Sequence, residues 1–272
     1  MRSDPDFVYC STTDQSRPFL EKLAAAAQAG FEGISLTIKE YLDIRSAGFS
    51  DLDLAAAVDD SGLYVAEVST ASRWLSGEVT EEEEIGVHLV SLLGAEGLNC
   101  TPLNAPYLGL DAAVVAFSAI CDRAGRRGVR CQVEFLPWTQ PADLQTAWEI
   151  VRLADRSNGG LIFDNWHFYR SGGALSDLRT VDPGKIFVIQ LSDAPEAPEY
   201  PDLLTETAHR LLPGQGAADV VGTVRGLEEI GVAAPYGGEV INPCWASSPA
   251  VENASVLHAA MREVVAAAAC GP

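Results

Sequence analysis

The 272-residue chain has few basic side chains. Its 18 lysines and arginines stand against 38 aspartates and glutamates, so the net charge is −20. Recognition of nucleic-acid phosphates needs a basic surface that releases bound counterions. We therefore expect no nucleic-acid partner. A small anionic substrate remains compatible, because one or two arginines are enough to hold it.

The sequence also lacks paired cysteines and long apolar runs. Its six cysteines include no C-x-x-C pair, which argues against a zinc knuckle or a redox dithiol. No apolar run approaches the roughly 20 residues of a membrane-spanning helix, and residues 1–5 contain no signal-peptide core. These absences predict a reduced, soluble, cytoplasmic protein with no membrane partner.

The chain does contain a regular alternation of strand-like and helix-like segments. The predicted strands are 7–10, 33–36, 63–68, 97–100, 129–136, 160–164, 186–191 and 236–241. The predicted helices are 17–29, 52–61, 80–93, 112–127, 141–154, 217–230 and 250–269. Repeated βα units favour parallel strands joined by right-handed crossovers, and a doubly wound sheet rarely needs eight repeats. We predict a single (β/α)₈ TIM barrel domain over residues 1–272.

Four of the predicted strands carry, at or near their carboxyl ends, a side chain that can bind a metal ion: Glu134, Asp164, Gln190 and Glu239. The carboxyl ends of barrel strands meet at one face, where TIM barrels place their active sites. Three carboxylates and an amide oxygen suit Mg²⁺ or Mn²⁺ best, with Co²⁺ and Zn²⁺ left open. We therefore predict one divalent metal site with these four ligands. For Gln190 the alternative is a hydrogen-bonding role inside the barrel mouth.

The four histidines offer two candidates for proton transfer. His88 and His258 fall within predicted helices, which leaves His167 and His209. His167 comes three residues after a predicted metal ligand, so it can face the same cavity and act as an acid or a base. The alternative for His167 is a structural loop residue.

Two arginines and two tryptophans follow predicted strands and can reach the mouth of the barrel. Arg210 precedes the Pro-Gly-Gln-Gly segment at 213–216, and its planar fork can hold a carboxylate. Arg73 is a second candidate anion clamp, or else a surface arginine. Trp138 and Trp166 can exclude water from the cavity, or else pack loops over its rim. Together with His209, these four residues form the predicted substrate-binding set.

An ordered set of segments resembles the xylose-isomerase-like TIM barrels, the superfamily of sugar phosphate isomerases and epimerases, inosose dehydratase and endonuclease IV. The segments are Gly30-Phe31-Glu32-Gly33-Ile34, Val133-Glu134, Asp164-x-x-His167, Gln190-Leu191-Ser192-Asp193-Ala194-Pro195, Arg210-x-x-Pro213-Gly214-Gln215-Gly216 and Gly238-Glu239. They extend from about the first strand to the eighth.

Within this superfamily the chain is most similar in motif to the bacterial 3-dehydroshikimate dehydratases, which carry Gln where Gln190 stands, whereas ketose 3-epimerases carry His. The resemblance implies the same four metal ligands, His167 as acid or base, and arginines on the substrate carboxylate. The chain departs from the pattern at 165–170, where we expect a bulky aromatic loop after the sixth strand, and this loop implies a substrate larger or less polar than dehydroshikimate.

We expect a metal-dependent dehydratase (lyase) or an isomerase or epimerase that removes a proton next to a carbonyl of a small polyhydroxylated substrate. His167, Glu134 and Glu239 are the candidates for the groups that move the proton. Dehydration and isomerisation both remain open, as does a homo-oligomeric state. An endonuclease IV-like phosphodiesterase is disfavoured by the four histidines and the charge of −20, and a non-catalytic barrel is disfavoured by the intact set of acids.

Overall fold

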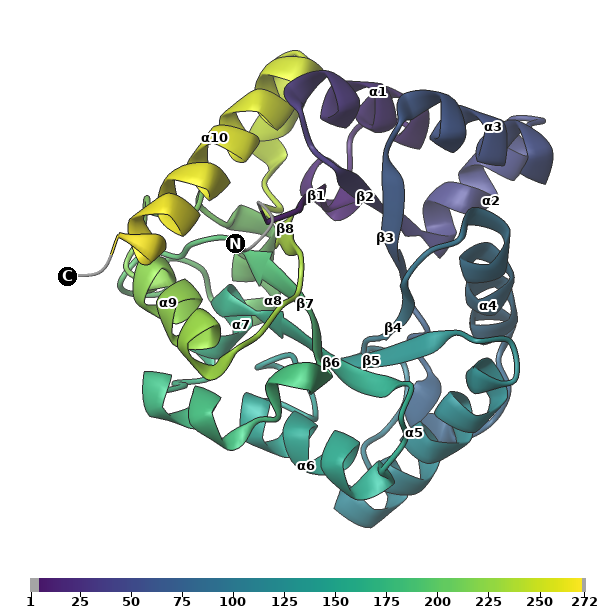
Figure 1. The fold of residues 1–272 in the computed structure, drawn as a ribbon, viewed down its shortest axis with the longest axis vertical. Coiled ribbons are helices and arrows are strands. Elements are labelled where there is room, and N and C mark those ends of the chain that lie inside the picture. The colour runs from purple at the N-terminus through teal and green to yellow at the C-terminus, as the bar shows by residue number, and fades with distance from the viewer. Residues whose placement is uncertain (1–4, 271–272) are drawn as a thin grey trace.

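The computed structural model describes residues 5–270 of the protein. Eight parallel strands close into a barrel in sequence order, and the first strand pairs with the last (Figure 1). The strands are β1 (Phe7–Tyr9), β2 (Gly33–Thr37), β3 (Tyr64–Ser69), β4 (Gly97–Cys100), β5 (Arg130–Glu134), β6 (Gly159–Asp164), β7 (Ile186–Leu191) and β8 (Tyr236–Gly238). The predicted TIM barrel is confirmed. That residues 1–272 form a single domain stays a prediction. The prediction that residues 1–5 contain no signal-peptide core falls mostly on residues 1–4, which lie outside the described residues.

Helices form an outer ring around the barrel (Figure 1). The α-helices are α1 (Phe19–Ala29), α2 (Ile38–Ser46), α3 (Asp51–Ser61), α4 (Glu81–Leu93), α5 (Leu110–Gly125), α6 (Leu144–Ala154), α7 (Asn165–Arg170), α8 (Leu203–Glu206), α9 (Val220–Ile230) and α10 (Ala250–Ala269). Short 3₁₀ helices are η1 (Ser11–Thr13), η2 (Trp74–Ser76), η3 (Leu175–Thr180), η4 (Pro183–Lys185), η5 (Thr207–His209) and η6 (Pro243–Ser247). Helix α10 lies between α9 and α1 and completes the ring.

Helix α6 illustrates how the sequence forms these outer helices. The Asp143 side chain accepts a hydrogen bond of 2.8 Å from the Thr146 N–H and so satisfies a free donor at the start of the helix. Leu144, Ala147 and Ile150 recur three residues apart and are buried against the barrel. Packing of such apolar stripes onto the outward-facing strand residues makes the main hydrophobic core.

The structure differs from the sequence-based expectation at three helices and at two strand ends. Helices α2, α7 and α8 were not predicted, and the loop expected at 165–170 is wrong, because α7 begins directly after β6. Strands β5 and β8 end at Glu134 and Gly238, earlier than the predicted 136 and 241. The chain leaves the barrel at these points, so the acidic residues there stand at the rim.

The interior of the barrel is polar toward the carboxyl ends of the strands. Glu67 of β3, Asn99 of β4, Gln132 of β5 and Gln190 of β7 are all buried and contact one another inside the ring of strands. Side chains two residues apart on a strand share a face, so Gln132 lies one layer below Glu134. This polar layer forms the floor of the site described next.

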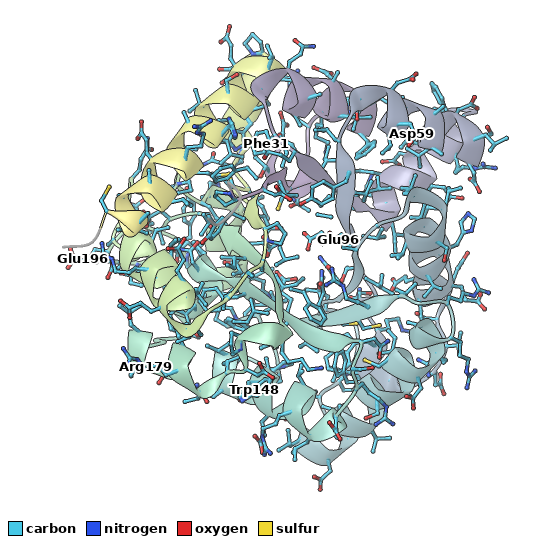
Figure 2. All side chains as sticks on the ribbon, in the orientation of Figure 1. Phe31, Asp59, Glu96, Trp148, Arg179 and Glu196 are labelled. Atoms are coloured by element: carbon cyan, nitrogen blue, oxygen red, sulfur yellow. The ribbon has the colours of Figure 1, made fainter. Side chains whose placement is uncertain are left out.

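The outer surface carries much of the negative charge. Asp59 and Glu196 lie at the periphery of the molecule, as does the basic Arg179 (Figure 2), and all three are exposed. Six free cysteines lie in the described residues, four of them buried. Among residues 5–270, no helix is both long and apolar enough to cross a membrane.

Candidate active site at the barrel mouth

A cavity of about 680 Å³ opens at the carboxyl ends of the strands. Its acidic lining residues are Glu82, Glu134 and Glu239, and its cationic or basic ones are Lys39, His167 and Arg210. Most of the remaining polar lining consists of hydroxyl and amide side chains: Thr12, Thr37, Ser69, Thr70, Ser72, Asn99, Thr101, Asn104, Gln190 and Thr207. The cavity therefore presents many neutral hydrogen-bonding groups around a small charged cluster.

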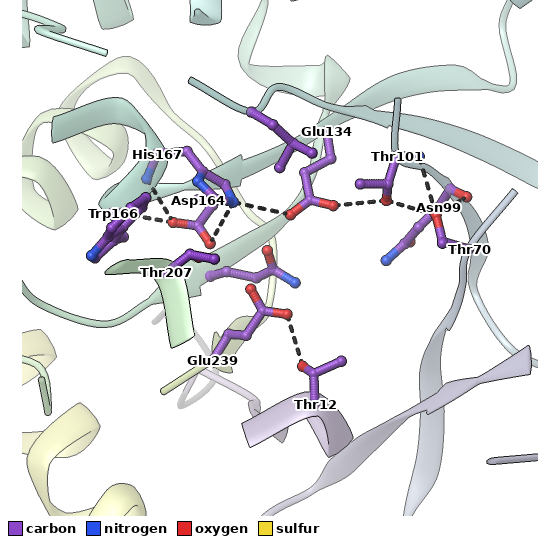
Figure 3. A network of polar contacts seen from close by, with 12 residues as sticks. Thr12, Thr70, Asn99, Thr101, Glu134, Asp164, Trp166, His167, Thr207 and Glu239 are labelled. Atoms are coloured by element: carbon purple, nitrogen blue, oxygen red, sulfur yellow. Dashed lines mark hydrogen bonds and ion pairs between the residues drawn. The ribbon is translucent and has the colours of Figure 1, made fainter. Parts of the chain in front are cut away.

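Asp164 ends β6 and at the same time caps α7. Its Oδ1 accepts hydrogen bonds from the backbone N–H groups of Trp166 (2.7 Å) and His167 (3.0 Å), as Figure 3 shows. Burial raises the pKa of the Asp164 carboxyl, but the charges of Arg210 and His167 and the helix N–H outweigh it. The net pKa lies below the ordinary value of 3.8, so Asp164 is held ionised. The cap also fixes His167 on the first turn of α7.

His167 and Glu134 lie beside Asp164. The His167 Nε2 atom is 3.5 Å from Glu134 Oε1 and 3.6 Å from Asp164 Oδ2, and one ligand atom from each of the three residues lies within 4.8 Å of the others. Glu134 is oriented from its other oxygen, which accepts a hydrogen bond of 2.8 Å from Thr101 Oγ1 (Figure 3). Three potential metal-binding groups thus converge at one point.

Glu239 approaches the cluster from the opposite side, just past β8. Its Oε1 accepts a hydrogen bond of 2.8 Å from Thr12, and its Oε2 is 3.1 Å from Nη1 of Arg210. Burial raises the pKa of Glu239 to about 8; Arg210 opposes this rise, while Glu134 and Asp164 add to it. The surroundings of Glu239 therefore disfavour its charged form even with Arg210 beside it.

Arg210 lies at the centre of the acidic groups and is only 2% exposed. Its Nη1 donates to Asp164 Oδ2 at 2.6 Å as well as to Glu239, and its Nη2 contacts His167 Nε2 at 3.3 Å. The guanidinium carbon lies 5.1 Å from the ring centre of Trp166. Arg210 thus compensates part of the buried negative charge.

Gln190 supplies the fourth predicted ligand, and its register places it beside Asp164. Its Nε2 donates to Glu67 Oε1 at 3.2 Å, whereas its buried Oε1 accepts no hydrogen bond from residues 5–270. A buried amide oxygen without a donor is costly unless another group satisfies it. Burial also raises the pKa of Glu67 to about 7, with Glu134 and Asp164 adding to the rise while the Asn99 and Gln190 side chains lower it.

The residues fit a divalent cation on two grounds. The donor set of Glu134, Asp164, Glu239 and Gln190 is the oxygen-rich type that Mg²⁺ and Mn²⁺ prefer. The second ground is the buried Gln190 oxygen without a donor, in a residue that lines the same cavity as Glu134 and Glu239. Of the four predicted ligands, Glu134 and Asp164 lie together with His167, Gln190 lies beside Asp164 on the next strand, and Glu239 is joined to Asp164 through Arg210.

The predicted substrate-binding residues lie in different surroundings. Arg210 and Trp138 line the cavity, and the Trp138 ring packs edge-on against His167 at 5.2 Å. Trp166 is fully buried behind Arg210. His209 stacks on Tyr200 at 4.0 Å and lies outside the lining. Arg73 is exposed on the loop before η2 and also lies outside the lining.

The glycine-rich segment at 213–216 has a structural part in the site. Asp193 accepts hydrogen bonds from the backbone N–H groups of Gly214 (3.0 Å), Gly216 (2.9 Å) and Ala218 (3.0 Å). A side chain on Gly216 would place its Cβ 2.2 Å from the carbonyl oxygen of Ala194. Residues 193–194 and 214–218 are two parts of the same connection after β7, and their close approach holds the segment that carries Arg210.

Several residues that contact the candidate ligands or line the cavity beside them were not predicted from the sequence: Thr12, Thr70, Asn99, Thr101 and Glu67. The Thr70 hydroxyl contacts the backbone carbonyl of Asn99 and the hydroxyl of Thr101, and Thr101 in turn donates to Glu134 (Figure 3). Glu67 offered one signal, since a lone acid inside the apolar strand 63–68 is unusual. Short hydroxyl side chains give no comparable signal.

The closed barrel of eight parallel strands, with an acidic cluster at the strand ends, makes this protein a TIM barrel with a candidate active site at its mouth. Residues 23–264 match the model of the xylose isomerase-like TIM barrel family. The chain belongs to this family, and the resemblance predicted from the motifs is confirmed.

Three comparisons describe its relatives. The chain is 30% identical over 254 residues to a 3-dehydroshikimate dehydratase from Pseudomonas aeruginosa, covering 90% of this chain but only 39% of that protein. It is 29% identical over 195 residues to an inosose isomerase from Bacillus licheniformis, covering 69% of each chain. The solved structure titled IolI protein with a bound zinc atom superposes with a TM-score of 0.85 at 22% identity, over 96% of this chain and 98% of that one. This last likeness concerns the fold alone.

Proposed function

We propose that the protein is a divalent-metal-dependent enzyme that removes a proton next to a carbonyl of a small polyhydroxylated substrate. The observation that carries the proposal is the cluster of Glu134 and Asp164 with His167, with Glu239 joined to Asp164 through Arg210 and with the unsatisfied oxygen of Gln190 on the neighbouring strand. Glu134, Asp164, Glu239 and Gln190 would hold the cation, with Mg²⁺ or Mn²⁺ favoured by the donor set. The names of the dehydratase and isomerase relatives support an enzyme of this kind.

The chain's own residues support proton transfer at this point. When bound, a divalent cation would act as a Lewis acid that polarises a substrate carbonyl. His167 Nε2 lies 3.3 Å from Arg210 Nη2, 3.5 Å from Glu134 Oε1 and 3.6 Å from Asp164 Oδ2, so charged groups on several sides fix the position of the imidazole. His167 lines the cavity, and an acceptor nitrogen there can take a proton from a substrate carbon. Trp138 packs against the imidazole and limits the access of water to it.

The first candidate reaction is dehydration of 3-dehydroshikimate. Its support is the similarity to the Pseudomonas dehydratase along 90% of this chain, together with Gln190 among the ligands. The chain spans about two fifths of that relative's length, so the activity of the whole relative is carried over only as a proposal.

The second candidate is isomerisation of a neutral cyclitol or sugar, and the cavity lining favours it. Among the described residues, Arg210 is the sole arginine of the lining, and it already contacts Asp164 and Glu239. Lys39 is exposed and pairs with Asp43 at 2.6 Å. The rest of the polar wall is mostly hydroxyl and amide groups, which suit the hydroxyls of an uncharged substrate.

The experiment has a binding arm and a turnover arm. Mn²⁺ is titrated calorimetrically into chelator-treated wild type and Glu239→Gln, and we expect one site per chain that the variant weakens strongly. Mn²⁺-loaded wild type is then assayed on 3-dehydroshikimate, followed by the absorbance of the aromatic product, and on an inosose, followed by NMR. Equal Mn²⁺ affinity in the two proteins would refute the metal site. Turnover of one substrate decides between the candidates, and turnover of neither would refute both.

A further inference from the structure

Glu67 lies beneath the candidate metal ligands, on the inward face of β3, and is 1% exposed. Its Oε1 accepts a hydrogen bond of 3.2 Å from Gln190 Nε2, and its Oε2 accepts one of 3.3 Å from Gln132 Nε2. It is absent from the cavity lining and therefore acts through its neighbours.

These two contacts restrict the orientation of both amides. In both contacts the glutamine nitrogen is the donor and a Glu67 oxygen is the acceptor, so each glutamine turns its NH₂ group toward Glu67. The two heteroatoms of an amide lie on opposite sides of the group. Gln190 therefore turns its oxygen away from Glu67, and this oxygen is the buried atom that has no donor among residues 5–270.

We propose that Glu67 is a positioning residue that holds the Gln190 amide with its oxygen, and not its NH₂, toward the candidate metal site. The inference rests on the proposed function, because it needs a cation at that site. With the amide reversed, an N–H group would face the cation and Gln190 would be lost as a ligand.

The hydrogen-bond network of Glu67 continues from Gln132 to Asn99 and Ser69, with the side-chain nitrogen as the donor at each step. Gln132 Nε2 also donates to Asn99 Oδ1 at 2.6 Å, and Asn99 Nδ2 donates to Ser69 Oγ at 2.8 Å. A serine hydroxyl can either donate or accept, so Ser69 tolerates reversal of Asn99. The charge can therefore be moved from position 67 to position 132 while every hydrogen bond keeps a donor and an acceptor.

This property defines the test, which is calorimetric titration of Mn²⁺ into the chelator-treated full chain. In Glu67→Gln, the new amide offers one acceptor to two donors, so Gln190 is free to reverse. Polar groups that orient metal ligands typically contribute about 10–100-fold to metal affinity, and we expect a loss of that size. A double variant combines Glu67→Gln with Gln132→Glu. Its amide at position 67 accepts a hydrogen bond from Gln190 and donates one to the carboxylate at position 132. The Mn²⁺ affinity of this double variant should therefore return toward that of wild type. Gln132→Met is the matched control: it removes the other donor to Glu67 and should leave affinity unchanged.

The outcomes separate this inference from the proposed function. Wild-type affinity in Glu67→Gln would overturn the role of Glu67 while leaving the metal site intact. An equal loss in Glu67→Gln and Gln132→Met, without recovery in the double variant, would make Glu67 a structural residue and overturn the inference. Absence of Mn²⁺ binding by wild type would refute the proposed function and the inference with it. Thermal unfolding of each metal-free variant confirms that the titrated proteins are folded.

Discussion

Individual residues of this site have several structural roles at the same time. Asp164 ends a strand, caps a helix and contacts Arg210, while Arg210 joins Asp164 and Glu239 and also contacts His167. Removing one partner of such a buried charge network leaves another charge unpaired, which is more costly than the loss of a surface ion pair. Substitutions here should therefore preserve shape and change one property at a time.

His167→Asn tests the proposed base. Asparagine does not accept and release protons at neutral pH, so the variant should bind Mn²⁺ like wild type while its turnover falls by about 10²–10⁴-fold. Exchange of the substrate α-hydrogen with solvent deuterium, followed by NMR, measures the proton-transfer step itself. His209→Asn is the control, since His209 stacks on Tyr200 outside the cavity and its loss should leave exchange unchanged. Full exchange in His167→Asn would assign the base to Glu134 or Glu239.

Arg210→Lys tests whether the guanidinium fork is needed. Lysine keeps the positive charge but cannot contact Asp164, Glu239 and His167 together. We expect kcat/KM to fall at least tenfold and the melting temperature of the metal-free protein to drop. Arg73→Lys makes the same change on the exposed loop before η2 and should alter neither quantity. Kinetics and melting temperature of Arg210→Lys that match those of wild type would mean that charge alone suffices at this position.

Whole elements were easier to predict than their contacts. The eight strands and the long amphipathic helices follow from hydrophobic periodicity, and the four candidate ligands follow from polar residues at or near the carboxyl ends of apolar strands. Helix α7 was missed because its stability comes from the Asp164 cap and from burial of its aromatic residues, neither of which the local pattern reveals. The role of Glu67 depends on barrel register, which brings β3 opposite β7, and no local pattern contains that information.

Gly216→Ala tests the packing of two parts of the connection after β7. The added Cβ would lie 2.2 Å from the Ala194 carbonyl oxygen and 2.4 Å from Asp193 Oδ1, so one of these two parts must move. Overpacking of this kind typically costs about 1–3 kcal/mol, and displacement of the loop that carries Arg210 should lower kcat as well. Gly184→Ala is the control, because its nearest neighbouring atom would be at 3.4 Å. Equal melting temperatures and rates for the two variants would contradict the requirement for glycine at 216.

At the scale of the whole molecule, the cluster of acids makes folding depend on pH. Glu67 and Glu239 have pKa values raised to about 7 and about 8, from an ordinary value of 4.5. Between pH 4.5 and these values the native protein retains protons that the unfolded chain has released. The stability of the metal-free protein should therefore be greatest near pH 5 and decline until about pH 8.

Chemical denaturation of chelator-treated protein between pH 5 and pH 9 measures this decline. Asp164 does not contribute in this range, because its lowered pKa affects stability only in acid. Glu239→Gln removes one of the two titrating carboxyls, so its stability should depend less steeply on pH than that of wild type. Saturating Mn²⁺ should also reduce the decline, because the cation favours the ionised carboxylates. A wild-type stability that rises steadily from pH 5 to pH 8 would contradict the raised pKa values.

The direct junction between β6 and α7 also determines where the length of the chain can change. One residue inserted between Asp164 and Asn165 would turn the helix by about 100° and move His167 away from the cluster, because α7 starts without any connecting residue. The segment 192–202, between β7 and α8, has eleven residues and largely exposed positions toward its end. Insertions and deletions should therefore be tolerated in the later part of that segment and rejected at the junction, so a loop graft intended to change the substrate belongs after β7 and not after β6.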